Sequence, residues 1–116
     1  MPDFKADCLF CKIAAGQIKA DIVYQDDRTV AFNDINPQAP VHVLVIPKDH
    51  YATLDDVTDR SIYRELFDTA AKVVELKKLS ADGYRVVANC KENGGQAVAH
   101  IHLHILGGRP MKWPPG

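Results

Sequence analysis

Three of the five histidines in this chain occur at every second position, in the segment 100–106, which reads HIHLHIL. Along a β-strand the side chains alternate between two faces, so His100, His102 and His104 would share one face and the aliphatic residues the other. Alternation alone is ordinary for a half-exposed strand, but a solvent-exposed face usually carries lysine, glutamate, threonine or serine. Histidine at all three positions predicts a site that uses imidazole chemistry, either metal binding or nucleophilic catalysis.

The spacing of the three rings bears on which of these two sites is present. Strand positions i and i+2 lie roughly 6.7 Å apart and the outer pair roughly 13 Å apart, whereas one zinc ion needs every ligand nitrogen at about 2 Å. Two neighbouring histidines could share a metal, but three could not without distortion. A neutral imidazole is a good nucleophile and leaving group near pH 7, so a nucleotidyl-histidine intermediate could form and hydrolyse. His102 is the natural nucleophile, because it has a histidine on each side.

The rest of the chain predicts the elements that position this strand. Runs rich in β-branched and aromatic residues predict strands at 22–25, 29–32, 41–46 and 84–89, with the histidine strand at 99–106. Apolar residues at three- and four-residue spacing predict a long helix over 58–79, capped by Thr58. A short helix is expected at 10–15, before Gly16, and a proline-containing loop at 34–40. The predicted fold class is α+β: a five-stranded antiparallel sheet packed with one long and one short helix.

Size and composition exclude several classes of function. The 116 residues are the usual size of one domain, so we expect a single domain over 1–116. The formal net charge is -1, which gives no basic field for nucleic acid. No apolar run approaches the roughly 18 to 20 residues of a membrane helix, and the N-terminus lacks the apolar core of a signal peptide. We therefore expect an intracellular protein, cytoplasmic or, in a eukaryote, also nuclear, that binds neither nucleic acid nor membranes.

The segment 100–106 resembles the defining motif of the histidine-triad superfamily, in which three histidines alternate with apolar residues. The resemblance continues in DINPQAP at 34–40, HVLVIPKDH at 42–50, GGQ at 94–96 and GGRPMKWPPG at 107–116, and these segments are similar to the Hint branch. It covers nearly the whole chain from Phe10. The resemblance implies a homodimer with one nucleotide site in each subunit. It also implies hydrolysis of purine nucleoside phosphoramidates, in which AMP is joined through a P–N bond to an amine or a lysine side chain.

The resemblance also implies roles for individual residues. His102 would be the nucleophile, His104 would contact the phosphate, and His42 would be a hydrogen-bonding partner of the triad, to which His100 also belongs. Asp34 would accept hydrogen bonds from the ribose hydroxyls. The phosphate side would be held by Asn89, Gly95, Gln96 and the backbone N–H of Ala97, and the base pocket would be lined by Phe10, Ile13, Phe32 and Ile35. No metal would be required for the chemistry.

Taken without the resemblance, several of these residues have simpler interpretations. Gly94 and Gly95 would form an ordinary turn, Asp34 would be a surface turn residue, and Phe10 and Phe32 would belong to the core. Those roles therefore depend mainly on the resemblance. The apolar base pocket that it implies would accept either adenine or guanine.

One position departs from the Hint pattern. In that branch a serine commonly follows the glutamine, and its hydroxyl helps with the phosphate or the leaving amine; here the residue is Ala97. Loss of one transition-state hydrogen bond can cost of order tenfold to a thousandfold in rate. The sequence therefore predicts a slower phosphoramidase or one with a different leaving-group preference.

A pair of cysteines, Cys8 and Cys11, has the C-x-x-C spacing that suits one tetrahedral metal, although a full site needs two more ligands. Superfamily members with this pair bind zinc through the two cysteines, the histidine after the Pro-Lys-x segment and the first triad histidine. The resemblance thus implies a structural zinc on Cys8, Cys11, His50 and His100. The alternatives are two reduced thiols with His50 at the surface, or a redox pair. Cys90 is expected to be a buried, inert thiol.

Two other functions remain open at this point. Other branches of the superfamily hydrolyse or phosphorolyse dinucleoside polyphosphates, or transfer nucleotides, with the same nucleophile. A nucleotide-binding interaction module with little turnover is the third possibility, and Ala97 is the residue that favours it.

Overall fold

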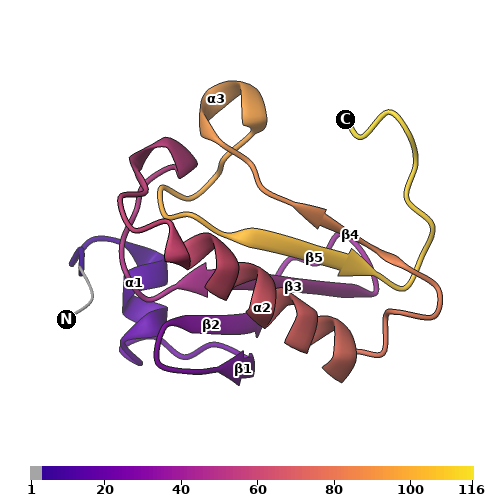
Figure 1. Cartoon of the computed structure of the whole chain (residues 1–116), viewed down its shortest axis with the longest axis horizontal. Helices are drawn as coiled ribbons and strands as arrows, with labels where there is room; N and C mark the ends of the chain where they lie inside the picture. Colours follow the sequence, from indigo (N-terminus) through magenta and orange to yellow (C-terminus); the bar gives the residue numbers. More distant parts are fainter. Residues whose placement is uncertain (1–3) are drawn as a thin grey trace.

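A computed structural model of the chain describes residues 4–116, and its centre is one antiparallel sheet (Figure 1). The strands are β1 (Ile22–Gln25), β2 (Thr29–Asn33), β3 (Val41–Pro47), β4 (Tyr84–Val87) and β5 (Leu103–Gly107). Their order across the sheet is β1-β2-β3-β5-β4, so β5 lies between β3 and β4. The predicted fold class, α+β with a five-stranded antiparallel sheet, is confirmed.

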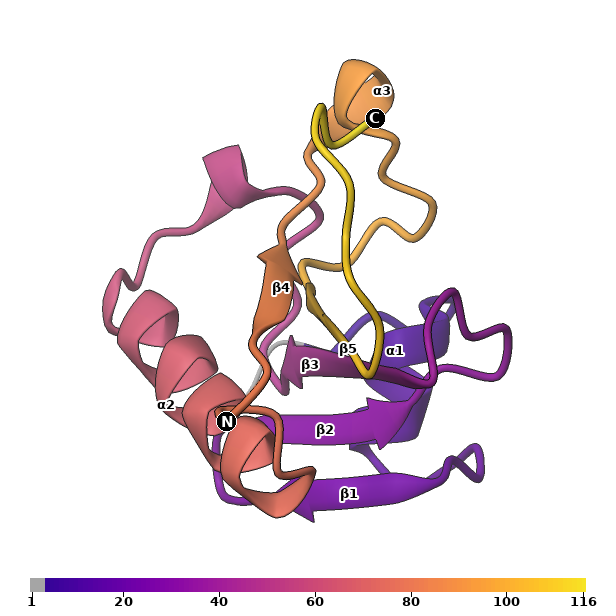
Figure 2. The same cartoon turned by 90° about the vertical axis from the view of Figure 1, so that its right-hand side faces the viewer.

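The long helix α2 (Ser61–Leu76) packs across one face of this sheet (Figure 2). The buried residues of the helix recur at three- and four-residue spacing and join a cluster with residues of β3 and β5; they include Ile62, Leu66, Ala70, Val73 and Val74. The predicted start at Thr58 is wrong, because the helix begins at Ser61. There the Asp59 carboxylate accepts from the backbone nitrogen (3.1 Å) and hydroxyl (2.6 Å) of Ser61. The helix ends at Leu76, before Lys78 adopts a positive φ of 58°.

The opposite face of the sheet carries the short helix α1 (Leu9–Ala14), which begins one residue earlier than predicted. Strand alternation sends Val30, Phe32, Leu44 and Ile46 to this face, where they form a second apolar cluster with Phe10 and with the two N-terminal cysteines. The two faces therefore have separate apolar clusters, and the second one adjoins the histidines.

The strand that carries the histidines is shorter than predicted. It enters the ladder at Leu103, opposite Val45, and not at Ala99. Upstream, the Ile101 nitrogen donates to the Tyr51 carbonyl (2.8 Å) and the His100 ring bonds the Pro47 carbonyl (2.8 Å), and neither bond belongs to the β3–β5 ladder. The alternation nevertheless holds, because Ile101, Leu103 and Ile105 all lie in the cluster under α2.

Two short elements of the structure have no counterpart among the predicted ones: the 3-10 turn η1 (Leu54–Asp56) and helix α3 (Lys91–Gly94). The predicted Gly94–Gly95 turn is the end of α3, where Gly95 takes the left-handed conformation (φ 75°) that favours glycine. The two loops are joined by a 2.7 Å ion pair between Lys91 and Asp55 and by a 2.6 Å bond from the Gln96 amide to the Ala52 carbonyl.

Between residues 4 and 116, no helix has both the length and the apolar character needed to cross a membrane.

Candidate active site

Three histidine rings meet on the sheet face opposite α2. His42 comes from β3 and His104 from β5, and their rings touch through Nε2 of His42 and Nδ1 of His104, 2.9 Å apart. The ring of His102, which comes just before β5, lies with its centroid 4.9 Å from that of His104. His42 and His102 are buried and His104 is half-buried. The structure therefore brings together three of the four histidines predicted to be catalytic.

The ring of His102 is oriented by the main chain. Its Nδ1 lies 2.8 Å from the carbonyl oxygen of His100. Because a carbonyl can only accept, Nδ1 carries the proton and the lone pair is on Nε2. Burial lowers the pKa of His102, against smaller opposing effects of the His100 carbonyl and of Asp34. The ring is therefore neutral near pH 7, which is the form that a nucleophile requires.

The other two rings have their tautomers set by a backbone amide. The Gln38 nitrogen donates to Nδ1 of His42 (3.0 Å), so His42 holds its proton on Nε2 and donates to Nδ1 of His104. The proton of His104 is then on its Nε2. Burial and, to a lesser extent, the neighbouring rings of His102 and His42 lower the pKa of His104 to about 4. A neutral Nε2–H donor thus lies beside the ring of His102.

The carboxylate of Asp34 lies at the edge of this group of rings. Its Oδ2 is 3.5 Å from Nε2 of His42, and its Oδ1 accepts a 2.9 Å hydrogen bond from the Asn36 nitrogen. It favours the protonated form of His42, although burial is the larger effect and the pKa of His42 is lowered. The Asn36 bond fixes the carboxylate.

An apolar pocket of about 290 Å³ lies beside the rings. Phe10 joins the two, because it lines the pocket and its ring edge also contacts His102, with centroids 5.2 Å apart. All the residues assigned to the base pocket line this cavity, and Ile35 is fully exposed at its rim. Asp34 lines it as well. Sequence reasoning missed further lining residues, notably Leu44, Asp21 and Asn33.

The hydrogen bonds of the glycine-rich loop at 94–96 are made within the loop and to a neighbouring segment. The backbone N–H groups of Gly95 and Gln96 donate to Glu92 and Lys91 (3.0 and 3.1 Å), and the Gln96 side chain bonds the Ala52 carbonyl. These hydrogen bonds run within the loop and to the segment before η1, and not to the histidine rings. Asn89 is half-buried and Ala97 is exposed.

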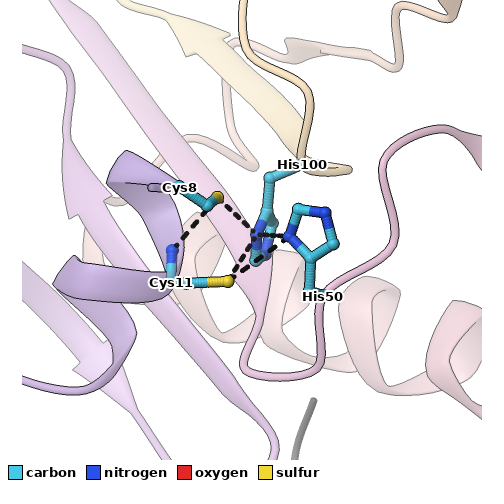
Figure 3. Close-up of side chains that lie close together, drawn as sticks. All are labelled: Cys8, Cys11, His50 and His100. Atoms are coloured by element: carbon cyan, nitrogen blue, oxygen red, sulfur yellow. Dashed lines mark hydrogen bonds between the residues drawn. The ribbon is translucent and has the colours of Figure 1, made fainter. Parts of the chain in front are cut away.

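The fourth predicted catalytic histidine, His100, lies in a different cluster (Figure 3). Its ring is fully buried and faces Cys8 and Cys11 of the α1 segment and His50, which follows β3. The Nδ1 of His100 is 3.3 Å from the Cys8 sulfur, 3.5 Å from the Cys11 sulfur and 3.2 Å from Nδ1 of His50. The Cys11 sulfur is also 3.3 Å from Nδ1 of His50.

These four side chains fit the requirements of a tetrahedral metal site. Bonds of about 2.0 to 2.3 Å in tetrahedral geometry place ligand atoms about 3.3 to 3.8 Å from one another, and all four donor atoms here lie within 4.8 Å of one another. Two thiolates and two imidazoles are a usual donor set for zinc. Cys90 lies outside this cluster and is half-buried, so the prediction that it is buried is wrong.

Comparison with known proteins agrees with this geometry. The family model of the HIT domain matches residues 15–111. A purine nucleoside phosphoramidase of Escherichia coli (strain K12) is 45% identical over 108 residues, which cover 90% of each chain. The crystal structure of a HIT family hydrolase from Legionella pneumophila Philadelphia 1 is 52% identical with a TM-score of 0.91, covering 95% of this chain and 100% of the other. A histidine triad protein from Clostridium difficile is 45% identical with a TM-score of 0.90, covering 93% and 96%. The chain belongs to the HIT domain family, as its histidine motif predicts.

Proposed function

We propose that this protein hydrolyses purine nucleoside 5′-phosphoramidates through a covalent nucleotidyl-His102 intermediate. The observation that carries the proposal is the state of His102: a neutral ring whose Nδ1–H is held by the His100 carbonyl, beside the His104 donor and an apolar pocket. Likeness to HIT family hydrolases supports hydrolysis, and the name of the E. coli relative supports the P–N bond as the one cleaved.

The proposed reaction has two displacement steps at phosphorus. First, Nε2 of His102 attacks the α-phosphorus, the P–N bond to the amine breaks, and the amine leaves after taking a proton. The Nε2–H of His104 donates to a phosphoryl oxygen or toward the leaving nitrogen. Second, water attacks the phosphorus and loses a proton that replaces the one taken by the amine, the bond to His102 breaks, and the nucleoside monophosphate is released. The ring of His102 ends as it began, with its proton on Nδ1.

Binding would be divided between Asp34 and the apolar pocket. The Asp34 carboxylate is acceptor-only when ionised, so it suits the two ribose hydroxyls. The base would lie in the cavity lined by Phe10, Ile13, Phe32 and Ile35. Because the N–H groups of Gly95 and Gln96 are engaged within their loop, we expect this loop to rearrange when a phosphate binds beside Asn89.

The proposal includes a structural zinc on Cys8, Cys11, His50 and His100. When bound, the metal would supply a rigid cross-link and no step of the chemistry. It would tie α1, the segment after β3 and the histidine segment together. Through His100 it would hold the carbonyl that orients His102.

We also propose that the protein is a homodimer with one site in each subunit. Strand β4 is at the edge of the sheet, where it can pair with another strand. Tyr84 on that strand and Trp113 near the C-terminus are large exposed hydrophobic residues, with relative accessibilities of 48% and 82%. Sedimentation equilibrium tests this, and a monomeric mass at micromolar concentration would contradict it.

The substrate class is tested by assaying an alkylamine phosphoramidate of AMP beside a diadenosine polyphosphate. We expect the P–N substrate to be cleaved to AMP with the higher kcat/KM. Faster cleavage of the polyphosphate would favour the dinucleoside polyphosphate reaction of other superfamily branches. Tight AMP binding with no turnover of either compound would favour a nucleotide-binding interaction module.

Replacing Ala97 with serine should raise kcat for the phosphoramidate by about tenfold or more, because a hydroxyl would become available to the phosphate or the leaving amine. Steady-state kinetics on wild type and Ala97→Ser measure the effect. Ala99→Ser adds the same hydroxyl at another exposed position of this segment and should leave kcat unchanged. An unchanged kcat in Ala97→Ser would refute the handicap assigned to alanine.

A further inference from the structure

The pocket beside the histidines has polar residues as well as apolar walls. Asp21 and Asn33 both line it, with Lys19 next to them. The Asn33 amide Nδ2 donates to Asp21 Oδ2 at 2.8 Å, and the Asn33 nitrogen donates to the Asp21 carbonyl at 2.9 Å. One hydrogen bond therefore holds the Asp21 carboxylate and the other holds its backbone, at the place where the chain enters β1 beside the end of β2.

The position of Asp21 and Asn33 relative to Asp34 determines which part of a bound nucleotide they can contact. Asp34 lies within 3.5 Å of the His42 ring, so it marks the end of the pocket nearest the histidines. Asn33 precedes it in the chain, and Asp21 lies beyond Asn33 on the neighbouring strand end. If the phosphate is at His102 and the ribose at Asp34, the edge of the base reaches toward Asp21 and Lys19.

The hydrogen-bonding groups of Asp21 distinguish the two purines. An ionised carboxylate is acceptor-only with about four lone-pair sites, and Asn33 uses one of them. Guanine presents N1–H and the 2-amino group side by side, two donors that one carboxylate can accept together. Adenine presents one amino donor next to N1, whose lone pair would face the carboxylate oxygen. Lys19 adds a donor for guanine O6. We therefore propose that Asp21, held by Asn33, makes this pocket selective for guanine nucleotides over adenine nucleotides.

This inference rests on the proposed function, because it concerns the base of the same substrate. Asp21 is exposed, so its hydrogen bonds compete with water and the selectivity is moderate. We expect GMP to bind about tenfold more tightly than AMP, the effect of roughly one charge-assisted hydrogen bond. IMP keeps N1–H and O6 but lacks the 2-amino group, so its affinity should fall between the two.

Isothermal titration of the three monophosphates into the wild-type protein gives the first test without any substitution. The dissociation constants should follow the order GMP, IMP, AMP, from tightest to weakest. In Asp21→Asn the GMP-to-AMP ratio should fall to near one, because an amide replaces one acceptor by a donor. Asp27→Asn, which removes the same charge from an exposed residue outside the pocket, should keep the wild-type ratio.

The outcomes separate this inference from the proposed function. Equal binding of the three nucleotides, or tighter binding of AMP, would overturn the guanine selectivity and leave the nucleotide site intact. A GMP preference that persists in Asp21→Asn would overturn the assignment to Asp21. If none of the three nucleotides binds, the proposed function itself fails.

Discussion

Replacing His102 with asparagine or alanine is expected to lower kcat for an AMP phosphoramidate by about 10⁴-fold or more while leaving nucleotide binding largely intact. The magnitude is that of losing a covalent nucleophile whose function no neighbour can take over. Asparagine is the closer match, because its side-chain amide can still donate to the His100 carbonyl that orients the native ring. Steady-state kinetics and titration with AMP measure the two effects separately.

Mass spectrometry tests the same step directly. Wild-type protein quenched in acid-free denaturant during turnover should carry the mass of one nucleotidyl group on the peptide that contains His102. The asparagine variant should show no such adduct, although its circular dichroism and thermal midpoint match those of wild type. An adduct on another residue, or full activity in the variant, would contradict the mechanism.

Removing a cysteine from the cluster of Cys8, Cys11, His50 and His100, the proposed zinc site, should produce the largest loss of stability. In Cys11→Ser, zinc should fall from about one ion per chain to near zero. The free energy of unfolding should fall by at least about 3 kcal/mol, because metal binding is coupled to folding. This corresponds to a drop in Tm of about 10 °C or more. Elemental analysis of protein purified without a histidine tag gives the stoichiometry, and calorimetry gives the Tm.

The third cysteine of the chain supplies the matched control. Cys90 is half-buried and outside the cluster, so Cys90→Ser should retain the metal and most of the stability. A strong chelator added to the wild-type protein should reproduce the Tm of Cys11→Ser. A native zinc content far below one per chain, or equal stability of the two serine variants, would remove the structural zinc from the proposal.

Local patterns in the sequence predicted the sheet and the face on which the histidines lie. The alternation along 100–106 holds even at 100–102, before the chain joins the ladder with β3. There Ile101 packs under α2, while the rings of His100 and His102 lie on the other side. The limits of the elements were less predictable. The histidine strand starts at Leu103 because His100 and Ile101 bond the distant residues Pro47 and Tyr51, and such pairings leave no trace in local composition.

The same distinction applies to the site. Spacing alone identified the alternating histidines and the Cys8–Cys11 pair, whereas His42 and His50 were assigned only through the family resemblance. Leu44 could have been found as well, because it lies two residues after His42 and so shares its face of β3. Gln38 could not, since it acts through its backbone N–H, which every residue but proline possesses. Asp21 and Asn33 belong to the site only because β1 and β2 end side by side, which the side-chain types do not reveal.

One main-chain oxygen, the carbonyl of His100, connects the cysteine cluster with the ring of His102. The ring of His100 belongs to the cysteine cluster, while its carbonyl holds His102, the proposed nucleophile, in the Nδ1–H tautomer. No codon change at position 100 can delete that oxygen. Substitutions there should therefore act by altering the path of the backbone, so that a change in the cysteine cluster would reorient the ring of His102 without removing its hydrogen-bond partner.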